Sequence, residues 1–235
     1  MIPKIITQTN KEVTNEATFT GYWEVKNNPK TTGRLGHISH AKKKNFDFFI
    51  AEQDWDIYNS KLIFLAKRSL PSLNHLSNLK NFCEGRDSVY TKWGQKILSK
   101  SFSDLATIWT SKILLFQTIK KHTSAPYIIW RDCVYNPNFH KIKQTNINNK
   151  IIMNKQSFPK TLFGGLLSME NLNFIKTIKH KIGASVIKIP YNMVDDVCDI
   201  YINCLKHIDS TFEIYDEEIV LSYMCNTHRD LFHII

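Results

Sequence analysis

Tyr127-Ile-Ile-Trp-Arg-Asp-Cys-Val-Tyr135 is the stretch of sequence that decides the fold. It is a short apolar run that ends in one acidic residue, Asp132, between a helical pattern and a long polar segment. Open α/β sheets bind their ligands beyond the carboxyl ends of the strands, so a carboxylate at this point is a candidate ligand contact. An Asp after an apolar run is also a common turn residue, so the pattern alone leaves two interpretations open.

The segment before this stretch carries the pattern of an amphipathic helix from about residue 103 to residue 121. Ser101 or Ser103 can cap its start, and apolar residues recur at helical spacing. The apolar positions are Leu105, Ile108, Trp109, Leu115, Phe116 and Ile119. Lys112 interrupts this stripe. Either its stem packs while its amine reaches water, or the amine has a function of its own.

The rest of the chain alternates strand-like and helix-like segments, which predicts an α/β protein with helices flanking a central sheet. No internal repeat or low-complexity linker divides the sequence, so residues 1–235 are expected to form one domain. The expected strands are 2–7, 46–51, 62–65 and 186–189. The further expected helices are 172–182, which Gly183 would end, 194–208 and 217–225.

Two polar segments are predicted to be loops. Residues 18–44 would form a mobile loop with one helical turn. Residues 136–160 would form a second mobile loop, and loops of this length are usually functional lids or disordered. We therefore expect the second loop to order over a bound ligand.

Composition limits the class of protein. With 43% hydrophobic and 22% charged residues the chain is an ordinary globular protein, and no apolar run approaches the length of a spanning helix. Its five cysteines include no CxxC pair, so they are expected to be reduced in the cytoplasm. The net charge of +10 suggests an anionic partner: a phosphorylated ligand, a membrane surface or nucleic acid. Nucleic acid is the least favoured, because no nucleic-acid-binding motif is present.

Several short motifs, in this order, resemble the HtrL/YibB-like group of bacterial glycosyltransferases. They span roughly residues 100–235, while Met1-Ile-Pro-Lys-Ile-Ile6 is separately similar to the first strand of several capsule and outer-chain sugar transferases. The motifs are Ser111-Lys112, Tyr127-Ile-Ile-Trp-Arg-Asp132, Phe163-Gly-Gly165, Asp216-Glu-Glu-Ile-Val-Leu221 and Asp230-Leu-Phe232.

The resemblance implies a GT-A-like single domain with a mixed, mostly parallel sheet. Such an enzyme would transfer a sugar from a nucleotide-diphosphate sugar to a glycan or lipid-linked glycan in surface polysaccharide or lipopolysaccharide assembly. It would work in the cytoplasm, with peripheral membrane contact compatible with the basic charge. Mn²⁺ or Mg²⁺ commonly neutralises the donor phosphates in this fold, bound by carboxylates and by the phosphates themselves.

The resemblance also selects candidate site residues. Asp132 would contact the metal or the ribose, but the chain has Asp132-Cys133-Val134 where this fold typically has Asp-x-Asp, which puts metal dependence in question. His228 or His233 would then be a second metal ligand. Lys112 or Arg131 could instead neutralise the phosphates.

Two further motifs have both a functional and a structural interpretation. Gly164 and Gly165 would let the backbone approach a sugar or phosphate, or would simply form a tight turn. Asp216 is the favoured catalytic base or donor-sugar contact, with Glu217 beside it. Acidic residues also stabilise the first turn of a helix for electrostatic reasons alone.

Two other functions remain open from the sequence. A non-catalytic basic protein could bind RNA or an anionic membrane through its lysine-rich segments. A nucleotidyltransferase could use the same strand-end Asp132, although that chemistry normally requires two clustered carboxylates.

Overall fold

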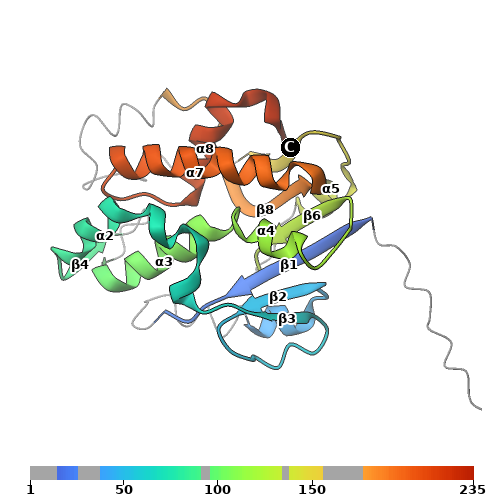
Figure 1. Cartoon of the computed structure of the whole chain (residues 1–235), viewed down its shortest axis with the longest axis horizontal. Coiled ribbons are helices and arrows are strands. Elements are labelled where there is room, and N and C mark those ends of the chain that lie inside the picture. Colours follow the sequence, from blue (N-terminus) through green and yellow to red (C-terminus); the bar gives the residue numbers. More distant parts are fainter. Residues whose placement is uncertain (1–14, 26–37, 91–95, 134–137, 156–176) are drawn as a thin grey trace, which may run out of the picture.

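A mixed seven-stranded sheet forms the centre of the fold. The computed structural model describes residues 15–25, 38–90, 96–133, 138–155 and 177–235. The strands are β1 (Glu16–Tyr22), β2 (Phe48–Ala51), β3 (Lys61–Phe64), β6 (Tyr127–Arg131), β7 (Ile151–Lys155), β8 (Ile182–Pro190) and β9 (Phe232–Ile234). They lie in the order β3-β2-β1-β6-β8-β7-β9 (Figure 1).

All of these strands except β8 point in the same direction. Parallel pairing joins β3 to β2, β2 to β1 and β1 to β6, whereas β8 is antiparallel to both β6 and β7. At the far edge, β9 pairs parallel with β7. The prediction of a mixed, mostly parallel sheet is therefore confirmed, and the carboxyl ends of β1, β2, β3 and β6 meet at one edge.

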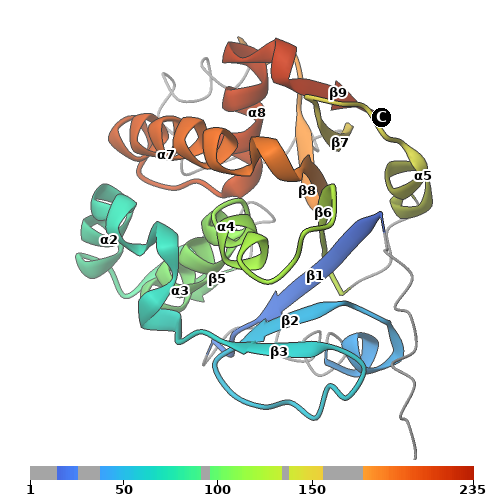
Figure 2. The same cartoon turned by 45° about the vertical axis from the view of Figure 1, so that its right-hand side comes forward.

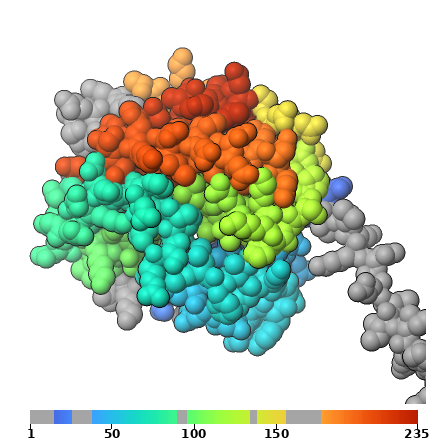
Figure 3. Space-filling view, in the orientation of Figure 1, coloured from blue at the N-terminus to red at the C-terminus, as the bar shows by residue number. Residues whose placement is uncertain are grey.

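Helices cover both faces of the sheet (Figure 2). The larger layer packs on the face that carries Phe19, Ile128 and Trp130. It comprises α2 (Ser77–Glu84), α3 (Ser99–Ser111), α4 (Leu115–Lys120), α7 (Val194–Thr211) and α8 (Glu217–Thr227). In the space-filling view, α7 forms a continuous band beside the segment that leads from β3 to α2 (Figure 3).

The opposite face has a smaller cover. The helical turn at residues 38–43 packs on Phe49 and Ala51, and α5 (Phe139–Gln144) packs on Ile129, Ile152 and Val186. Successive residues of a strand point to opposite faces, so Ile128 and Ile129 enter different cores. Short elements complete the described chain: β4 (Ser88–Tyr90), β5 (Lys96–Leu98), and the 3-10 turns η1 (Lys67–Ser69), η2 (Pro71–His75), η3 (Tyr191–Met193) and η4 (Arg229–Leu231).

The first described strand, β1, lies partly inside the segment predicted to be a loop at 18–44. That prediction is wrong for residues 18–22, because Ala17 and Phe19 are buried while the alternating threonines face the smaller layer. A side chain at Gly21 would meet the ring of Trp23 at 2.7 Å, so glycine lets the tryptophan fold back over the strand. The predicted strand at 2–7 lies outside the described residues.

The predicted helix at 103–121 is two helices, α3 and α4, separated by a turn at 112–114. The predicted serine cap is also wrong, since α3 begins at Ser99 and its N-cap residue, Leu98, makes no side-chain cap. The turn matters for function because it directs Lys112 toward the sheet rather than toward water.

Two other predictions need correction. The segment at 136–160 is not a loop throughout, because its apolar residues Ile142, Ile151 and Ile152 are buried in α5 and β7. Residues 156–160 lie outside the described part. Gly183 does not end a helix, because it belongs to β8. The predicted helices at 194–208 and 217–225 are confirmed as α7 and α8. Among the described residues, none of the helices has the length and apolar character needed to cross a bilayer.

Candidate functional site

A buried cluster of three charged residues lies at the carboxyl end of β6. The Lys112 Nζ is 3.1 Å from Asp132 Oδ1 and 2.8 Å from Glu217 Oε1. These residues come from the turn after α3, the end of β6 and the first turn of α8. The fold therefore brings together three of the residues that the sequence singled out, from motifs that are far apart in the chain.

Local structure explains each position in the cluster. The chain turns at Lys112 because α3 ends there, and the short step before α4 leaves its side chain facing the sheet. Trp130 points to the same side of β6, and its Nε1 donates to Asp132 Oδ1 at 2.8 Å. Glu217 follows the cap residue of α8, where the helix dipole favours a negative charge.

Lys112 makes three polar contacts, which equals the number of protons on its ammonium. Besides the two carboxylates, its Nζ lies 3.5 Å from the carbonyl oxygen of Ala184 in β8. Burial by itself would lower the pKa of Lys112, but the charges of Asp132 and then Glu217 outweigh it and raise the pKa above its usual value. The ammonium is thus a fixed positive charge whose donors all have partners inside the protein.

Asp132 is the member of the cluster that a ligand can reach. Its side chain is 26% exposed, whereas those of Lys112 and Glu217 are 8% exposed. Oδ1 accepts from Trp130 Nε1 at 2.8 Å and lies 3.1 Å from the lysine Nζ, which donates to Oδ2 at 3.5 Å. Both oxygens are therefore held from inside the protein, and Oδ2, with the longer of these contacts, can accept a further hydrogen bond.

Asp216 and Arg131 have other surroundings. Asp216 is buried and caps α8, accepting from the backbone nitrogens of Glu218 at 3.1 Å and Ile219 at 3.2 Å. Arg131 lies on the opposite face of β6 from Trp130, with its guanidinium 3.7 Å from the centre of the Phe139 ring. Burial lowers the pKa of Arg131. Neither side chain joins the contacts that Lys112 makes.

The predicted metal pair of Asp132 and His228 is not brought together. His228 follows the last residue of α8, about 16 Å along the helix axis from Glu217 at its first turn, at 1.5 Å per residue. Its Nδ1 instead lies 2.9 Å from Thr227 Oγ1. The described residues contain no cluster of three or more His, Cys, Asp or Glu side chains that could hold a metal ion. Gly164 and Gly165 lie outside the described residues.

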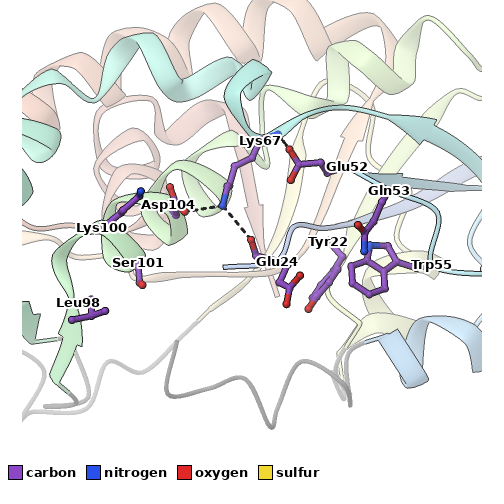
Figure 4. A pocket seen from close by; sticks show the side chains of 10 residues that line it. All are labelled: Tyr22, Glu24, Glu52, Gln53, Trp55, Lys67, Leu98, Lys100, Ser101 and Asp104. Carbon is purple, nitrogen blue, oxygen red and sulfur yellow. Dashed lines mark hydrogen bonds and ion pairs between the residues drawn. The ribbon is translucent and has the colours of Figure 1, made fainter. Parts of the chain in front are cut away.

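A pocket that no motif predicted opens at the same edge of the sheet (Figure 4). Its cavity volume is about 440 Å³. It is formed where β1, β2 and β3 end and where α3 begins. The lining residues are Tyr22, Glu24, Glu52, Gln53, Trp55, Lys67, Leu98, Lys100, Ser101 and Asp104.

Aromatic rings and an ordered lysine define this strand-end pocket. The rings of Tyr22 and Trp55 meet edge to face with their centres 5.1 Å apart. The Lys67 Nζ pairs with Asp104 at 2.7 Å and donates to the carbonyl oxygen of Glu24 at 3.1 Å, as Figure 4 shows. The acidic and aromatic run at residues 52–58, between two predicted strands, was the one sequence signal that could have located the pocket.

The strand-end pocket and Asp132 share one edge of the sheet. Phe19 of β1 pairs with Trp130 of β6, so the two strands reach Tyr22 and Asp132 at nearly the same level. Beyond the last paired residues, Thr20 Oγ1 still lies 3.5 Å from Cys133 Sγ. A ligand bound at this edge can therefore contact residues that follow several parallel strands, as is usual in open α/β sheets.

Comparison with known proteins gives no match: neither a protein-family model nor a curated protein sequence matches the chain.

Proposed function

We propose that the protein is a glycosyltransferase that uses a nucleotide-diphosphate sugar as donor and a glycan as acceptor. The observation that carries the proposal is the strand-end pocket with its two aromatic rings, located at the same sheet edge as the anchored carboxylate of Asp132. A mixed, mostly parallel sheet with one opposed strand is compatible with a GT-A-like fold. The resemblance to HtrL/YibB-like enzymes supports the same class.

The pocket has the chemistry that a nucleoside requires. Tyr22 and Trp55 offer aromatic surface to a base, and stacking of a base on such a ring contributes about 1–3 kcal/mol. Glu24, Glu52 and Gln53 add groups that can accept hydrogen bonds from ribose or base. The volume of about 440 Å³ is in the range of small-molecule sites.

Asp132 is our candidate for the contact with a hydroxyl of the donor. Its Oδ2 can accept a further hydrogen bond, while Trp130 and Lys112 keep the carboxylate in one orientation. Glu217 balances the charge of Lys112, so the lysine can stay buried and protonated beside the aspartate. Preorganised groups of this kind lose little entropy when the ligand arrives.

The donor phosphates require positive charge from another source. Lys100 lines the pocket and makes no ion pair within the described residues, whereas Lys67 is paired with Asp104 and Lys112 with Asp132 and Glu217. A divalent cation, when bound, would supply Lewis-acid neutralisation of the phosphates. Because Asp132 is already paired with Lys112 and accepts from Trp130, the described residues fit a metal poorly, and we assign no step to one.

The acceptor hydroxyl has to lose a proton during transfer. Asp216, which the sequence favoured as the base, is buried and hydrogen-bonded to two backbone nitrogens of α8. We therefore propose that Asp216 positions Glu217 through the helix, and that the proton goes to the diphosphate of the donor as its bond to the sugar breaks.

A thermal-shift panel of UDP-, GDP-, CMP- and dTDP-sugars tests the proposal, with and without Mn²⁺. One nucleotide class should raise the melting temperature of the wild type, and Trp55→Ala should remove the shift. Tyr58→Ala is the matched control, because Tyr58 is a neighbouring aromatic residue that is 88% exposed and does not line the pocket.

If no nucleotide sugar changes the melting temperature, the glycosyltransferase proposal fails. Salt-sensitive retention of the protein on RNA or on anionic vesicles would then favour a basic binding protein instead.

A further inference from the structure

A second hollow adjoins the strand-end pocket on the side of α2 and α3. Its cavity volume is about 460 Å³. The two cavities share Leu98, Lys100 and Asp104, so they adjoin along the start of α3. The residues that line only the second hollow are Lys80, Cys83, Glu84, Arg86, Asp87 and Ser103.

The charges that line the second hollow balance each other. Three basic side chains face three acidic ones: Lys80, Arg86 and Lys100 against Glu84, Asp87 and Asp104. Such a surface does not select for an anion, because a phosphate or carboxylate would meet as many negative as positive groups. It offers hydrogen-bond donors and acceptors side by side, which complements a ligand that carries many hydroxyl groups.

Several of these side chains are available to a ligand. Within the described residues, Glu84, Asp87 and Lys100 make no side-chain hydrogen bond and no ion pair, and all three are exposed. Arg86 is ordered in advance: its guanidinium lies 3.6 Å from the centre of the Phe82 ring, and its Nη1 donates to the Phe82 carbonyl oxygen at 3.1 Å. Less entropy is lost when an ordered group of this kind binds.

Two features restrict what the hollow can do. Leu98 is 46% exposed on the ridge between the cavities and gives an apolar surface against which the C–H face of a sugar ring can pack. Burial raises the pKa of Cys83 to about 11, so the thiol stays protonated near neutral pH and does not act as a nucleophile. The hollow is therefore suited to non-covalent binding.

We propose that the second hollow binds an uncharged oligosaccharide. On the proposed function, on which this assignment rests, the oligosaccharide is the part of the acceptor glycan that lies away from the reacting hydroxyl. The two adjoining cavities would hold donor and acceptor next to each other, with Leu98 and Lys100 between them. Binding of remote sugar units would increase affinity and orient the acceptor for transfer.

The test uses fluorescently labelled full-length protein on an array of neutral and acidic oligosaccharides. The variant is Glu84→Gln with Asp87→Asn, which replaces one acceptor oxygen of each carboxylate by an amide donor while keeping the size of both side chains. The matched control is Glu213→Gln with Asp199→Asn, which changes the same two residue types at exposed positions outside both cavities. Both variants alter the net charge equally.

We expect the wild type and the control to bind neutral oligosaccharides, and the hollow variant to lose at least tenfold in signal. The assignment is overturned if no neutral glycan binds, if only acidic glycans bind, or if the two variants bind alike. Repeating the array with the nucleotide from the thermal-shift panel separates the two proposals. If a nucleotide sugar raises the melting temperature but no glycan binds, only the assignment of the second hollow is rejected. If a glycan binds but no nucleotide sugar raises the melting temperature, only the glycosyltransferase proposal is rejected.

Discussion

The buried charged cluster and the strand-end pocket lie at one edge of the same sheet, yet they are built in opposite ways. The cluster consists of residues that short motifs singled out, and its members Lys112 and Glu217 are nearly inaccessible. The pocket consists of side chains from many loops and strand ends, and no motif marked them. The motifs thus identified the residues of the buried cluster, while the residues that line the pocket carry no motif.

Removing Lys112 should lower the free energy of unfolding more than the substitutions at Trp55 and Asp216, and it tests whether the cluster stabilises the fold. Lys112→Met leaves Asp132 and Glu217 without their shared cation, and breaking a buried ion pair in this way costs about 3–5 kcal/mol. The free energy of unfolding in urea measures the loss. A loss below about 1 kcal/mol would mean that water screens the cluster as it screens surface ion pairs, and that the cluster does not support the fold.

Removing Trp55 should weaken nucleotide binding and cost less stability than removing Lys112, because Trp55 packs only at the margin of the smaller core. Loss of a stacking ring should raise the dissociation constant by a factor that corresponds to about 1–3 kcal/mol. Isothermal titration with the nucleotide found in the thermal-shift panel measures this constant. Equal binding by Trp55→Ala and by wild type would move the nucleoside out of the strand-end pocket.

Asp216 allows a sharper comparison of structural and catalytic roles. Asp216→Ala removes the cap of α8 and should cost about 1 kcal/mol of stability, whereas Asp216→Asn keeps a good cap and should cost less. Sugar transfer by Asp216→Asn should stay close to wild type if the residue is only a cap. A loss of transfer in this variant, with its stability intact, would restore Asp216 as the base.

The smallest effect is the change in the free energy of unfolding when the pH is varied near neutrality. Burial raises the pKa of Cys204 to about 11 and that of Cys225 to about 11, from an ordinary 9.0. Between these two pKa values the folded state keeps protons that the unfolded state releases. The contribution of the two buried thiols to the free energy of unfolding is therefore complete below pH 9 and is lost as the pH rises through 11.

Urea unfolding at a series of pH values checks this expectation. Stability should change little between about pH 7 and 9 and fall above pH 9, and thiol reagents should label the native protein slowly at pH 8. Rapid labelling of the wild type at pH 8 would contradict the burial of the thiols between α7 and α8.

Elements with strong local patterns were predictable, and elements that depend on distant partners were not. The helices α7 and α8 and the strand β6 carry clear periodicity or an unbroken apolar run, and the sequence located them. The strand β1 was not predicted, because its alternating threonines look polar until both faces of the sheet are covered. The break between α3 and α4 was not predicted either, because an apolar stripe continues across it.

For the site, the sequence identified Lys112, Asp132 and Glu217 as notable but did not place them together. It offered Asp132 for a metal or the ribose, and Lys112 or Arg131 for the phosphates, whereas the fold pairs both carboxylates with the lysine. The strand-end pocket was not predicted, because its walls come from segments whose proximity depends on strand order. Glu52, Lys67 and Asp104 have no shared pattern in the sequence.

By itself, the sequence determined the α/β class, the position of the carboxylate at the end of β6 and the two C-terminal helices, because these depend on apolar periodicity over a few turns or one strand. Only the tertiary structure decided that β6 lies between β1 and β8, that Lys112 turns inward to join two distant carboxylates, and that Tyr22 and Trp55 form one wall of a pocket. Strand order and side-chain convergence follow from how the whole chain buries its apolar surface, which is a long-range property that no local pattern contains.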